Sequence, residues 1–467
     1  MAVARQSPGL GVFALASIVT AAALCPSTVL AEPGDHIRIG DTTITPSVMS
    51  GLEFHSNVYL ADGGSSAPEV PALAWVLKPR MKLDLDGKNA KVGFEFGYGV
   101  KKFFDVNADD AFNVQNLDRF SDFDAQLAAN FLPRSVVGVR LDDKFEVSST
   151  PAELPTKDGI ANASVVRTGN DLTGGAVIRP GTALNLEALG LLGVDIYEVP
   201  EELIADETDA AFNNRLQYGP LVNASWKFLP KTSLISSFSY TFMRWDKNFI
   251  EAIGPDLESS AIGAYVGKPD ADAWRFTAGV NGQFTPKLAA AGSVGFGAMY
   301  YDEQSVIDDA AGVEGSSAEL NTTGEETFAT DSSAIDGLLF NAQVSYAPIR
   351  GQTLTGGYRK DFQDAVFTNY VAYHYLFLKY EGSIQNRLGL GAEVNYRIDQ
   401  YHGEVARGDQ NIGLKGNVSY KITSYLTTAG GVAWARRACL EKNCNDNQFY
   451  STQYDDVSAT ANLTFTY

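Results

Sequence analysis

A short turn built around proline recurs along this chain, between segments whose apolar and polar residues alternate. Near copies of the turn are Phe131-Leu132-Pro133-Arg134, Phe228-Leu229-Pro230-Lys231 and Phe284-Thr285-Pro286-Lys287, with looser ones at Arg179-Pro180-Gly181 and Ala347-Pro348-Ile349-Arg350. Each turn is followed by an alternating run, a long polar connection, a second alternating run and then the next turn. Because proline has no amide donor, it belongs in turns or at strand starts. The order predicts an antiparallel meander with one short-turn end and one long-loop end.

The alternating segments have the period of a β-strand. Between Lys91 and Lys101, for example, apolar residues occupy every even position from Val92 to Val100, while glycine or charged residues occupy the odd ones. Side chains of a strand point to opposite faces in turn, so each run has one apolar and one polar face. A soluble sandwich would share this alternation. Runs of about ten or more residues and the repeated short and long connections favour a transmembrane barrel instead.

The alternating runs predict about 18 strands, an even number as expected for a single-chain bacterial barrel. They fall at 42–60, 71–86, 90–104, 118–131, 135–147, 168–179, 182–198, 215–228, 232–246, 273–285, 288–302, 336–347, 353–362, 366–381, 386–400, 409–421, 425–437 and 455–467. The long connections are 61–70, 105–117, 148–167, 199–214, 247–272, 303–335, 401–408 and 438–454. The predicted fold is therefore an all-β, up-and-down transmembrane barrel, with short periplasmic turns and long extracellular loops.

The N-terminal residues predict export. Arg5 precedes a short apolar stretch from Leu10 to Leu24, and Val29-Leu30-Ala31 ends this region with small residues at the spacing that suits a signal peptidase. Lipidation at Cys25 is disfavoured by Leu24, which is larger than the residue such a site prefers. The expected organisation is a signal peptide at 1–31, a short periplasmic segment at 32–41 and an outer-membrane barrel at 42–467, in a Gram-negative bacterium.

Composition agrees with an exported barrel. The net charge of −20 and the pI near 4.6 would repel nucleic acid. Mean hydropathy is only −0.10, and beyond the signal no stretch has the roughly 18 consecutive apolar residues of a membrane helix. A barrel exposes every second residue to lipid, so its hydropathy averages near zero.

A barrel of this size has room for an aqueous channel, and strand parity predicts which charged residues line it. The candidates are Lys78, Arg80, Lys82, Asp84, Glu95, Lys101, Arg140, Arg275, Arg359, Arg387, Glu393, Arg397 and Lys415. In one interpretation they form cross-strand charge ladders that stiffen the wall. In the other they shape the passage of solutes, with the stripe of Lys78, Arg80 and Lys82 favouring anions.

Catalytic chemistry is sparse in the sequence. The four histidines, His36, His55, His374 and His402, lie on separate segments, and no phosphate-binding loop, Cys/His metal spacing or hydrolase elbow is present. His55 near Glu53 and Ser56, or His402 near Asp399, could imitate the rim site of an outer-membrane hydrolase. We nevertheless expect no enzyme activity, no metal and no cofactor.

Two long connections suggest further features. From Asp302 to Asp336 there are ten acidic residues and no Lys or Arg, which suits a solvated loop, an inward-folded constriction, or a surface bridged by divalent cations to lipopolysaccharide. Cys439 and Cys444 lie four residues apart in the last long connection. Because the topology places them in an oxidising environment, and no His or third Cys accompanies them, we predict a disulfide between them.

Several short motifs resemble those of β-barrel porin families of proteobacteria. They are Ile44-Thr45-Pro46-Ser47 leading to Ser56-Asn57-Val58-Tyr59, the Phe-x-Pro-Lys turns, and the C-terminal Thr464-Phe465-Thr466-Tyr467. His55 stands where such families often have Asp or Tyr. The aromatic end of the last strand resembles the signal read by the barrel-insertion machinery, and the resemblance covers the chain from about residue 42.

The resemblance includes myxobacterial barrels that are encoded with polysaccharide-export machinery. It implies an outer-membrane conduit for polysaccharide, surrounded by lipid and lipopolysaccharide and working with a separate periplasmic export protein. One alternative is a diffusion porin or uptake channel for small solutes. Another is a structural or surface-interaction barrel without a transport role.

Overall fold

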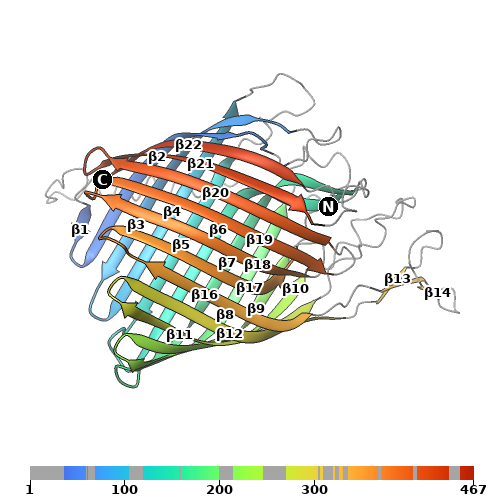
Figure 1. Cartoon of the computed structure of the whole chain (residues 1–467), viewed down its shortest axis with the longest axis horizontal. Coiled ribbons are helices and arrows are strands. Elements are labelled where there is room, and N and C mark those ends of the chain that lie inside the picture. The colour runs from blue at the N-terminus through green and yellow to red at the C-terminus, as the bar shows by residue number, and fades with distance from the viewer. Residues whose placement is uncertain are drawn as a thin grey trace, which may run out of the picture.

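The chain forms a closed antiparallel β-barrel of 18 strands (Figure 1). The structure, a computed structural model, describes residues 36–58, 60, 69–104, 119–156, 159–198, 214–245, 270–302, 305–308, 319–320, 326–329, 335–365, 370–402, 407–440 and 453–467. None of these residues belongs to a helix long and apolar enough to cross a membrane. The predicted signal peptide at 1–31 lies outside the described residues.

The strands of the wall follow one another in chain order. The first eleven are β2 (Thr42–His55), β3 (Ala72–Asp86), β4 (Ala90–Phe104), β5 (Arg119–Phe131), β6 (Val137–Thr156), β7 (Gly159–Ile178), β8 (Leu184–Glu198), β9 (Arg215–Leu229), β10 (Thr232–Trp245), β11 (Ala271–Thr285) and β12 (Leu288–Tyr301). The remaining seven are β16 (Ile335–Tyr346), β17 (Gln352–Asp364), β18 (Tyr370–Ile384), β19 (Leu388–His402), β20 (Arg407–Lys421), β21 (Leu426–Cys439) and β22 (Tyr454–Thr466).

The barrel closes where its first and last strands meet. β2 pairs with β3 along its whole length and with β22 from Ser47, opposite Thr466, to His55, opposite Ser458. The short strand β1 (Ile37–Ile39) pairs with the start of β2, so part of the segment predicted at 32–41 belongs to the sheet. Tyr467 donates its amide to the carbonyl of Pro46 at 2.9 Å. Closure leaves the wall without a free edge.

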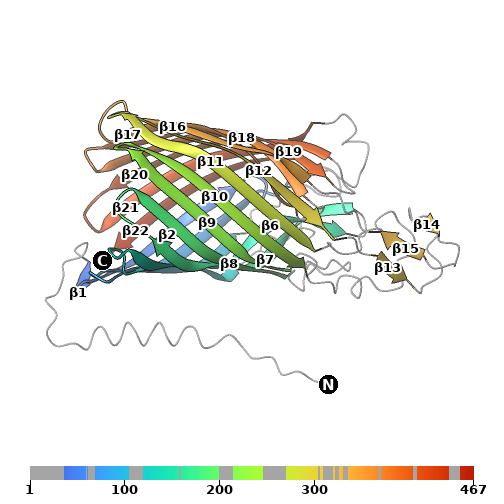
Figure 2. The same ribbon diagram turned by 90° about the horizontal axis from the view of Figure 1, so that it is seen from below.

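The two ends of the barrel differ as the sequence predicted. Pro133, Pro230 and Pro286 lie in the short turns that follow β5, β9 and β11. The short turns, β1 and the C-terminus gather at one end, and the long connections leave from the other (Figures 1 and 2). We call these the short-turn end and the long-loop end.

Three connections depart from the predicted boundaries. The segment 148–167 was predicted as a long loop, but its described residues extend β6 and β7 into a hairpin, with Ser148 opposite Arg167. β2 ends at His55 rather than near residue 60. Within the predicted loop 303–335, β13 (Ser305–Asp308), β14 (Glu319–Leu320) and β15 (Glu326–Ala329) form a separate three-stranded sheet.

The outer surface of the wall is apolar. Every second residue of a strand points outward, and large exposed apolar side chains such as Leu338, Val432 and Val294 occupy these positions. Aromatic residues flank this band: on β9, Tyr218 stacks on Phe242 toward the long-loop end, and Trp226 lies beside Phe228 toward the short-turn end. Tyr218 and Trp226 are about 26 Å apart along the strand, or about 20 Å of depth at a tilt near 40°. Such an apolar band with aromatic borders suits a lipid bilayer.

Candidate functional site

The inner face of the wall is the candidate site, and strand register identifies it. Val48 and Leu52 of β2 are exposed on the outside, so Met49 and Ser47 point inward together with their β3 partners Lys78 and Arg80. Followed from strand to strand, the register places twelve of the thirteen candidates on this inner face: Lys78, Arg80, Lys82, Asp84, Glu95, Lys101, Arg140, Arg275, Arg359, Glu393, Arg397 and Lys415.

Arg387 differs from the other candidates. It lies in the turn between β18 and β19, where Gln385 and Asn386 adopt left-handed backbone conformations with φ of 51° and 55°. Its amide donates to the carbonyl of Ile384 at 3.1 Å, and its side chain is exposed. The predicted strand began two residues too early here, although Asn386 is of a residue type that tolerates left-handed turn conformations.

The basic stripe of β3 is neutralised by its neighbours. Lys78 pairs with Asp124, Arg80 pairs with Asp124 at 3.1 Å and with Glu95 at 2.9 Å, and Lys82 pairs with Asp84 at 2.8 Å. Three cations thus meet three carboxylates on β3, β4 and β5. The stripe presents no excess positive charge to a passing anion, which favours the charge-ladder interpretation for this part of the wall.

Toward the long-loop end, buried carboxylates hold arginines in fixed positions. Asp195, whose side chain is 4% exposed, pairs with Arg167 at 2.6 Å and with Arg215 at 2.7 Å. Asp409, 2% exposed, pairs with Arg437 at 2.5 Å. Buried charges of this kind are tolerated only when paired and hydrogen-bonded. These arginines are therefore parts of the wall rather than mobile cations.

One segment leans inward from the wall over its neighbouring strands. Arg215 of β9 pairs with Asp364, at the end of β17, at 3.1 Å. Five strand spacings separate β9 from β17 along the wall, about 24 Å at the usual spacing of neighbouring strands. Side chains of Arg and Asp cannot span that distance from the wall alone. The end of β17 therefore leans inward, over the inner face of the strands between β9 and β17.

An apolar cluster supports this inward-leaning segment. Phe362 of β17 and Tyr370 of β18 pack with inner-face residues at the long-loop end, namely Met243, Trp245, Ala271, Ala273, Met299, Tyr301 and Leu339. Arg275 stacks over the Phe362 ring at 4.3 Å and donates to its carbonyl at 2.7 Å. Apolar side chains facing a water-filled lumen would be costly, so their burial by Phe362 and Tyr370 fixes the segment in place.

The segment therefore narrows the lumen near the long-loop end. A second, smaller apolar cluster combines Ala72 and Ala74 of β3 and Phe103 of β4 with Val70, which precedes β3, and Val58 packs against it. The sequence suggested a constriction from residues 303–335, of which only Ile335 has a described side chain; it packs against the first apolar cluster. No sequence signal indicated a constriction at the end of β17, because no spacing relates residue 215 to residue 364.

The histidine at the rim closes the seam between β2 and β22. His55 bonds Glu53 through Nε2 at 2.7 Å and Asp456 through Nδ1 at 3.1 Å, and Glu53 also pairs with Lys101 at 3.0 Å. Ser56 donates to Asp456 at 3.3 Å, not to the imidazole. With both ring nitrogens bound to carboxylates, His55 has none available to activate Ser56 as a nucleophile. Among the described residues, no group of His, Cys, Asp or Glu could hold a metal ion.

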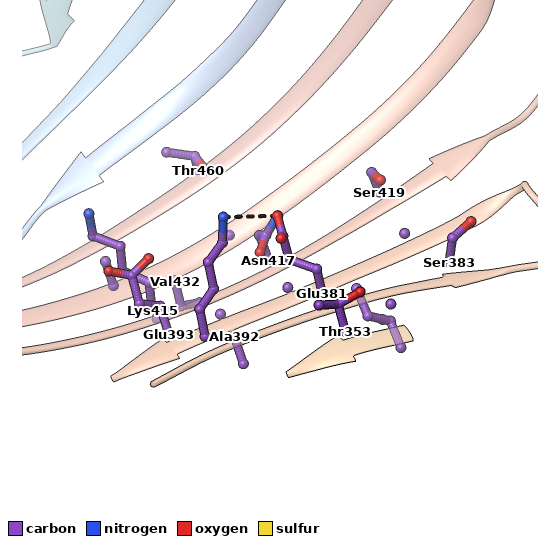
Figure 3. A pocket seen from close by; sticks show the side chains of 18 of the residues that line it. Thr353, Glu381, Ser383, Ala392, Glu393, Lys415, Asn417, Ser419, Val432 and Thr460 are labelled. Atoms are coloured by element: carbon purple, nitrogen blue, oxygen red, sulfur yellow. Dashed lines mark ion pairs between the residues drawn. The ribbon is translucent and has the colours of Figure 1, made fainter. Parts of the chain in front are cut away.

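The inner wall has a hollow of about 660 Å³ between β17 and β22, toward the short-turn end (Figure 3). Its lining includes the candidates Glu393 and Lys415, together with small polar residues such as Asn417 and Ser419. The hollow opens to the lumen. It lies on the path between the constriction and the short-turn mouth.

The predicted disulfide lies at the long-loop end. Cys439, the last residue of β21, is disulfide-bonded. Cys444 lies outside the described residues, so the pairing of these two cysteines stays a prediction.

Comparison with known proteins finds only remote likenesses. No protein-family model matches this chain, and no curated protein matches its sequence. Among solved structures, a BenF-like porin from Pseudomonas fluorescens Pf-5 is 10% identical over 92% of this chain and 100% of its own, with a TM-score of 0.46. The outer membrane protein opdK from Pseudomonas aeruginosa is 11% identical, with a TM-score of 0.43. OccAB3 from Acinetobacter baumannii is 12% identical, with a TM-score of 0.44. Each of these two matches covers 92% of this chain and 100% of the other. Likenesses this remote say nothing about what this chain transports.

Proposed function

We propose that the chain is a non-enzymatic channel in the outer membrane of a Gram-negative bacterium, through which small polar solutes diffuse. The observation that carries the proposal is a closed 18-strand barrel with an apolar outer band and a charged, polar inner face. A barrel of this size encloses more space than wall side chains can fill. The lumen therefore holds water and offers solutes a polar path across the bilayer.

The inward-leaning end of β17 sets an upper limit on solute size. The contact between Arg215 and Asp364 holds this end inside the bore, and Phe362 packs against the inner face of the intervening strands. A polysaccharide conduit needs a clear bore for a continuous chain of sugar rings. The polysaccharide-export role implied by the sequence resemblance has no support in the arrangement of the lumen, and the small-solute alternative fits it better.

Ion currents through the purified chain test this proposal. The purified chain, reconstituted in a planar lipid bilayer, should give stepwise ion currents. Asp364→Ala should enlarge each step, because it releases the contact that holds the end of β17 inside the bore while Arg215 keeps its bond to Asp195. Asp142→Ala is the matched control: it also removes one inner carboxylate, but its partner Arg140 lies two residues away on the same strand. The absence of any step in folded protein would contradict a channel.

Deletion of the gene separates the two kinds of cargo. If the channel serves small solutes, surface polysaccharide should be unchanged and uptake of a small nutrient should slow. Loss or trapping of a surface polysaccharide, with small-solute uptake intact, would instead favour export and overturn the proposal.

A further inference from the structure

The hollow in the inner wall owes its depth to glycine. Gly389 and Gly391 of β19 lie opposite Ser419 and Asn417 of β20. A Cβ at Gly391 would meet Asn417 Oδ1 at 2.0 Å, and one at Gly389 would meet Ser419 Oγ at 2.5 Å. The absence of these Cβ atoms lets both polar side chains lie flat against the wall. The wall is thereby hollowed, and its hydrogen-bonding atoms stay at the surface of the hollow.

The charged side chains of the hollow balance one another. Two lysines, Lys379 and Lys415, face two glutamates, Glu381 and Glu393, so the formal charges cancel. The remaining inward-pointing side chains with polar atoms are hydroxyls and an amide: Thr353, Ser383, Asn417, Ser419, Ser458 and Thr460. In Figure 3, Glu393 and Lys415 lie together at one side, and Ser383 and Ser419 lie at the other. Hydrogen-bonding groups are thus spread across the whole hollow.

Two of the charged groups have bonding capacity left over. Lys379 pairs with Glu381 at 2.9 Å. Glu393 and Lys415 are register partners on β19 and β20, yet no ion pair joins them, and Lys415 has no partner in the described part of the chain. Glu393 accepts a long hydrogen bond of 3.4 Å from Asn395 and also interacts with the Tyr375 hydroxyl and, at longer range, with the Lys379 ammonium, which together leave part of its four lone pairs open. An ammonium with three donors and a carboxylate with open lone pairs therefore face the lumen side by side.

We propose that this hollow is a transit site for small, uncharged, hydroxyl-rich solutes of about the size of a monosaccharide. The inference rests on the proposed channel function and names the class of solute. Hydroxyl groups can donate to Glu393 and accept from Lys415 and Asn417 at the same time. Hydrogen bonds to charged groups are stronger than those between neutral groups, and they exchange readily with water in an open site.

The balanced charge explains why a neutral solute fits best. An anion drawn to Lys415 meets Glu393 and Glu381, and a cation drawn to Glu393 meets Lys415 and Lys379. A neutral polyol meets no like charge and satisfies both open groups. The volume of about 660 Å³ falls within the range of small-molecule pockets. Because the hollow stays open to the lumen, binding should be weak and exchange fast, as transport requires.

The experiment uses the reconstituted full-length chain and the ion current that it carries. D-glucose, added at rising concentration, should reduce the current of the open channel in a saturable manner. Potassium acetate at equal osmolality, and triethylene glycol, which has few hydroxyl groups, should give no saturable reduction. Glycine betaine tests the competing idea that the paired charges select a zwitterion. A saturable effect of glycine betaine without one of glucose would overturn the proposal.

Two variants place the effect in the hollow. Lys415→Met should weaken the effect of glucose about tenfold, which is the loss of one charged hydrogen bond, and Asn417→Leu should also weaken it. Lys144→Met is the matched control, because it removes one inner lysine from β6, outside the hollow. Each variant's own ion current reports that it has folded. An unchanged glucose effect in Lys415→Met and Asn417→Leu would assign the binding elsewhere.

The outcomes separate this inference from the channel function. A normal ion current that glucose does not reduce would overturn the transit site and leave the channel intact. No ion current from folded protein would overturn the channel itself.

Discussion

A buried carboxylate depends more strongly on the arginine beside it than an exposed carboxylate does. Asp409 is 2% exposed and depends on Arg437, whereas Glu95 and Asp124 share Arg80 in a half-exposed network. Removing one partner from a buried pair leaves a charge that water cannot reach. Removing one partner from an exposed pair leaves a charge that water solvates. The same kind of contact therefore contributes differently along one lumen.

This difference gives the first prediction. Arg437→Ala should lower the free energy of unfolding by about 3 kcal/mol, because Asp409 stays buried without its arginine. Arg80→Ala should lower it by less than about 1 kcal/mol. Urea unfolding in detergent micelles, followed by tryptophan fluorescence, measures both. Replacing Arg437 and Asp409 together by leucine should recover most of the loss. Equal losses for the two single variants would contradict this account of burial.

The sequence predicts the face on which a residue lies, but not every contact that the residue makes. Parity alone located inner-face residues such as Arg80, Glu393 and Lys415, because strand alternation is local in the chain. It could not pair Arg215 with Asp364, since their contact depends on how far the end of β17 leans inward. Nor did it show that Lys78 and Arg80 are neutralised, because their partners are set by the register between β3, β4 and β5.

Whole strands were predictable for a related reason. All 18 predicted runs correspond to strands of the wall, since a lipid-facing surface forces apolar residues onto every second position. One stretch of strand escaped the rule. Residues 148–156 and 159–167 pair as a hairpin although their apolar and polar residues do not alternate, so the sequence favoured a loop there.

The seam between β2 and β22 gives the second prediction. His55 bonds both Glu53 and Asp456, so it fastens the first strand to the last at the rim. His55→Ala should lower the free energy of unfolding by about 2 kcal/mol through the loss of charged hydrogen bonds. His374→Ala, which removes one bond to Tyr358, should cost about 1 kcal/mol or less. Thermal unfolding followed by circular dichroism compares them, and a larger loss for His374→Ala would refute a fastening role for His55.

The connection between β21 and β22 gives the third prediction. Mass spectrometry of unreduced peptides should find Cys439 joined to Cys444. Because the closed loop is short, replacing both cysteines by serine should cost at most about 2 kcal/mol. Two alkylatable thiols in the native protein would rule the bond out. They would also count against an oxidising location for this end of the barrel.

At the scale of the whole molecule, the lumen has two unlike halves. Buried ion pairs and an inward-leaning segment narrow the half near the long loops, whereas glycines hollow the wall of the other half. A solute that enters from the long-loop end would first be limited by size and then meet a site rich in hydrogen-bonding groups. This order suits a channel that excludes large molecules before it contacts small ones.

The orientation of the barrel in the membrane is the last prediction. Bacterial barrels have short periplasmic turns and longer extracellular loops, and here Pro230 and the C-terminus share the short-turn end. An epitope tag inserted near Gly315, in the connection between β12 and β16, should therefore bind antibody on intact cells. A tag near Pro230 should bind only after the outer membrane is permeabilised. The reverse pattern would invert the orientation, and with it the order in which solutes meet the constriction and the hollow. Recovery of the tagged protein in the soluble fraction would contradict a membrane barrel altogether.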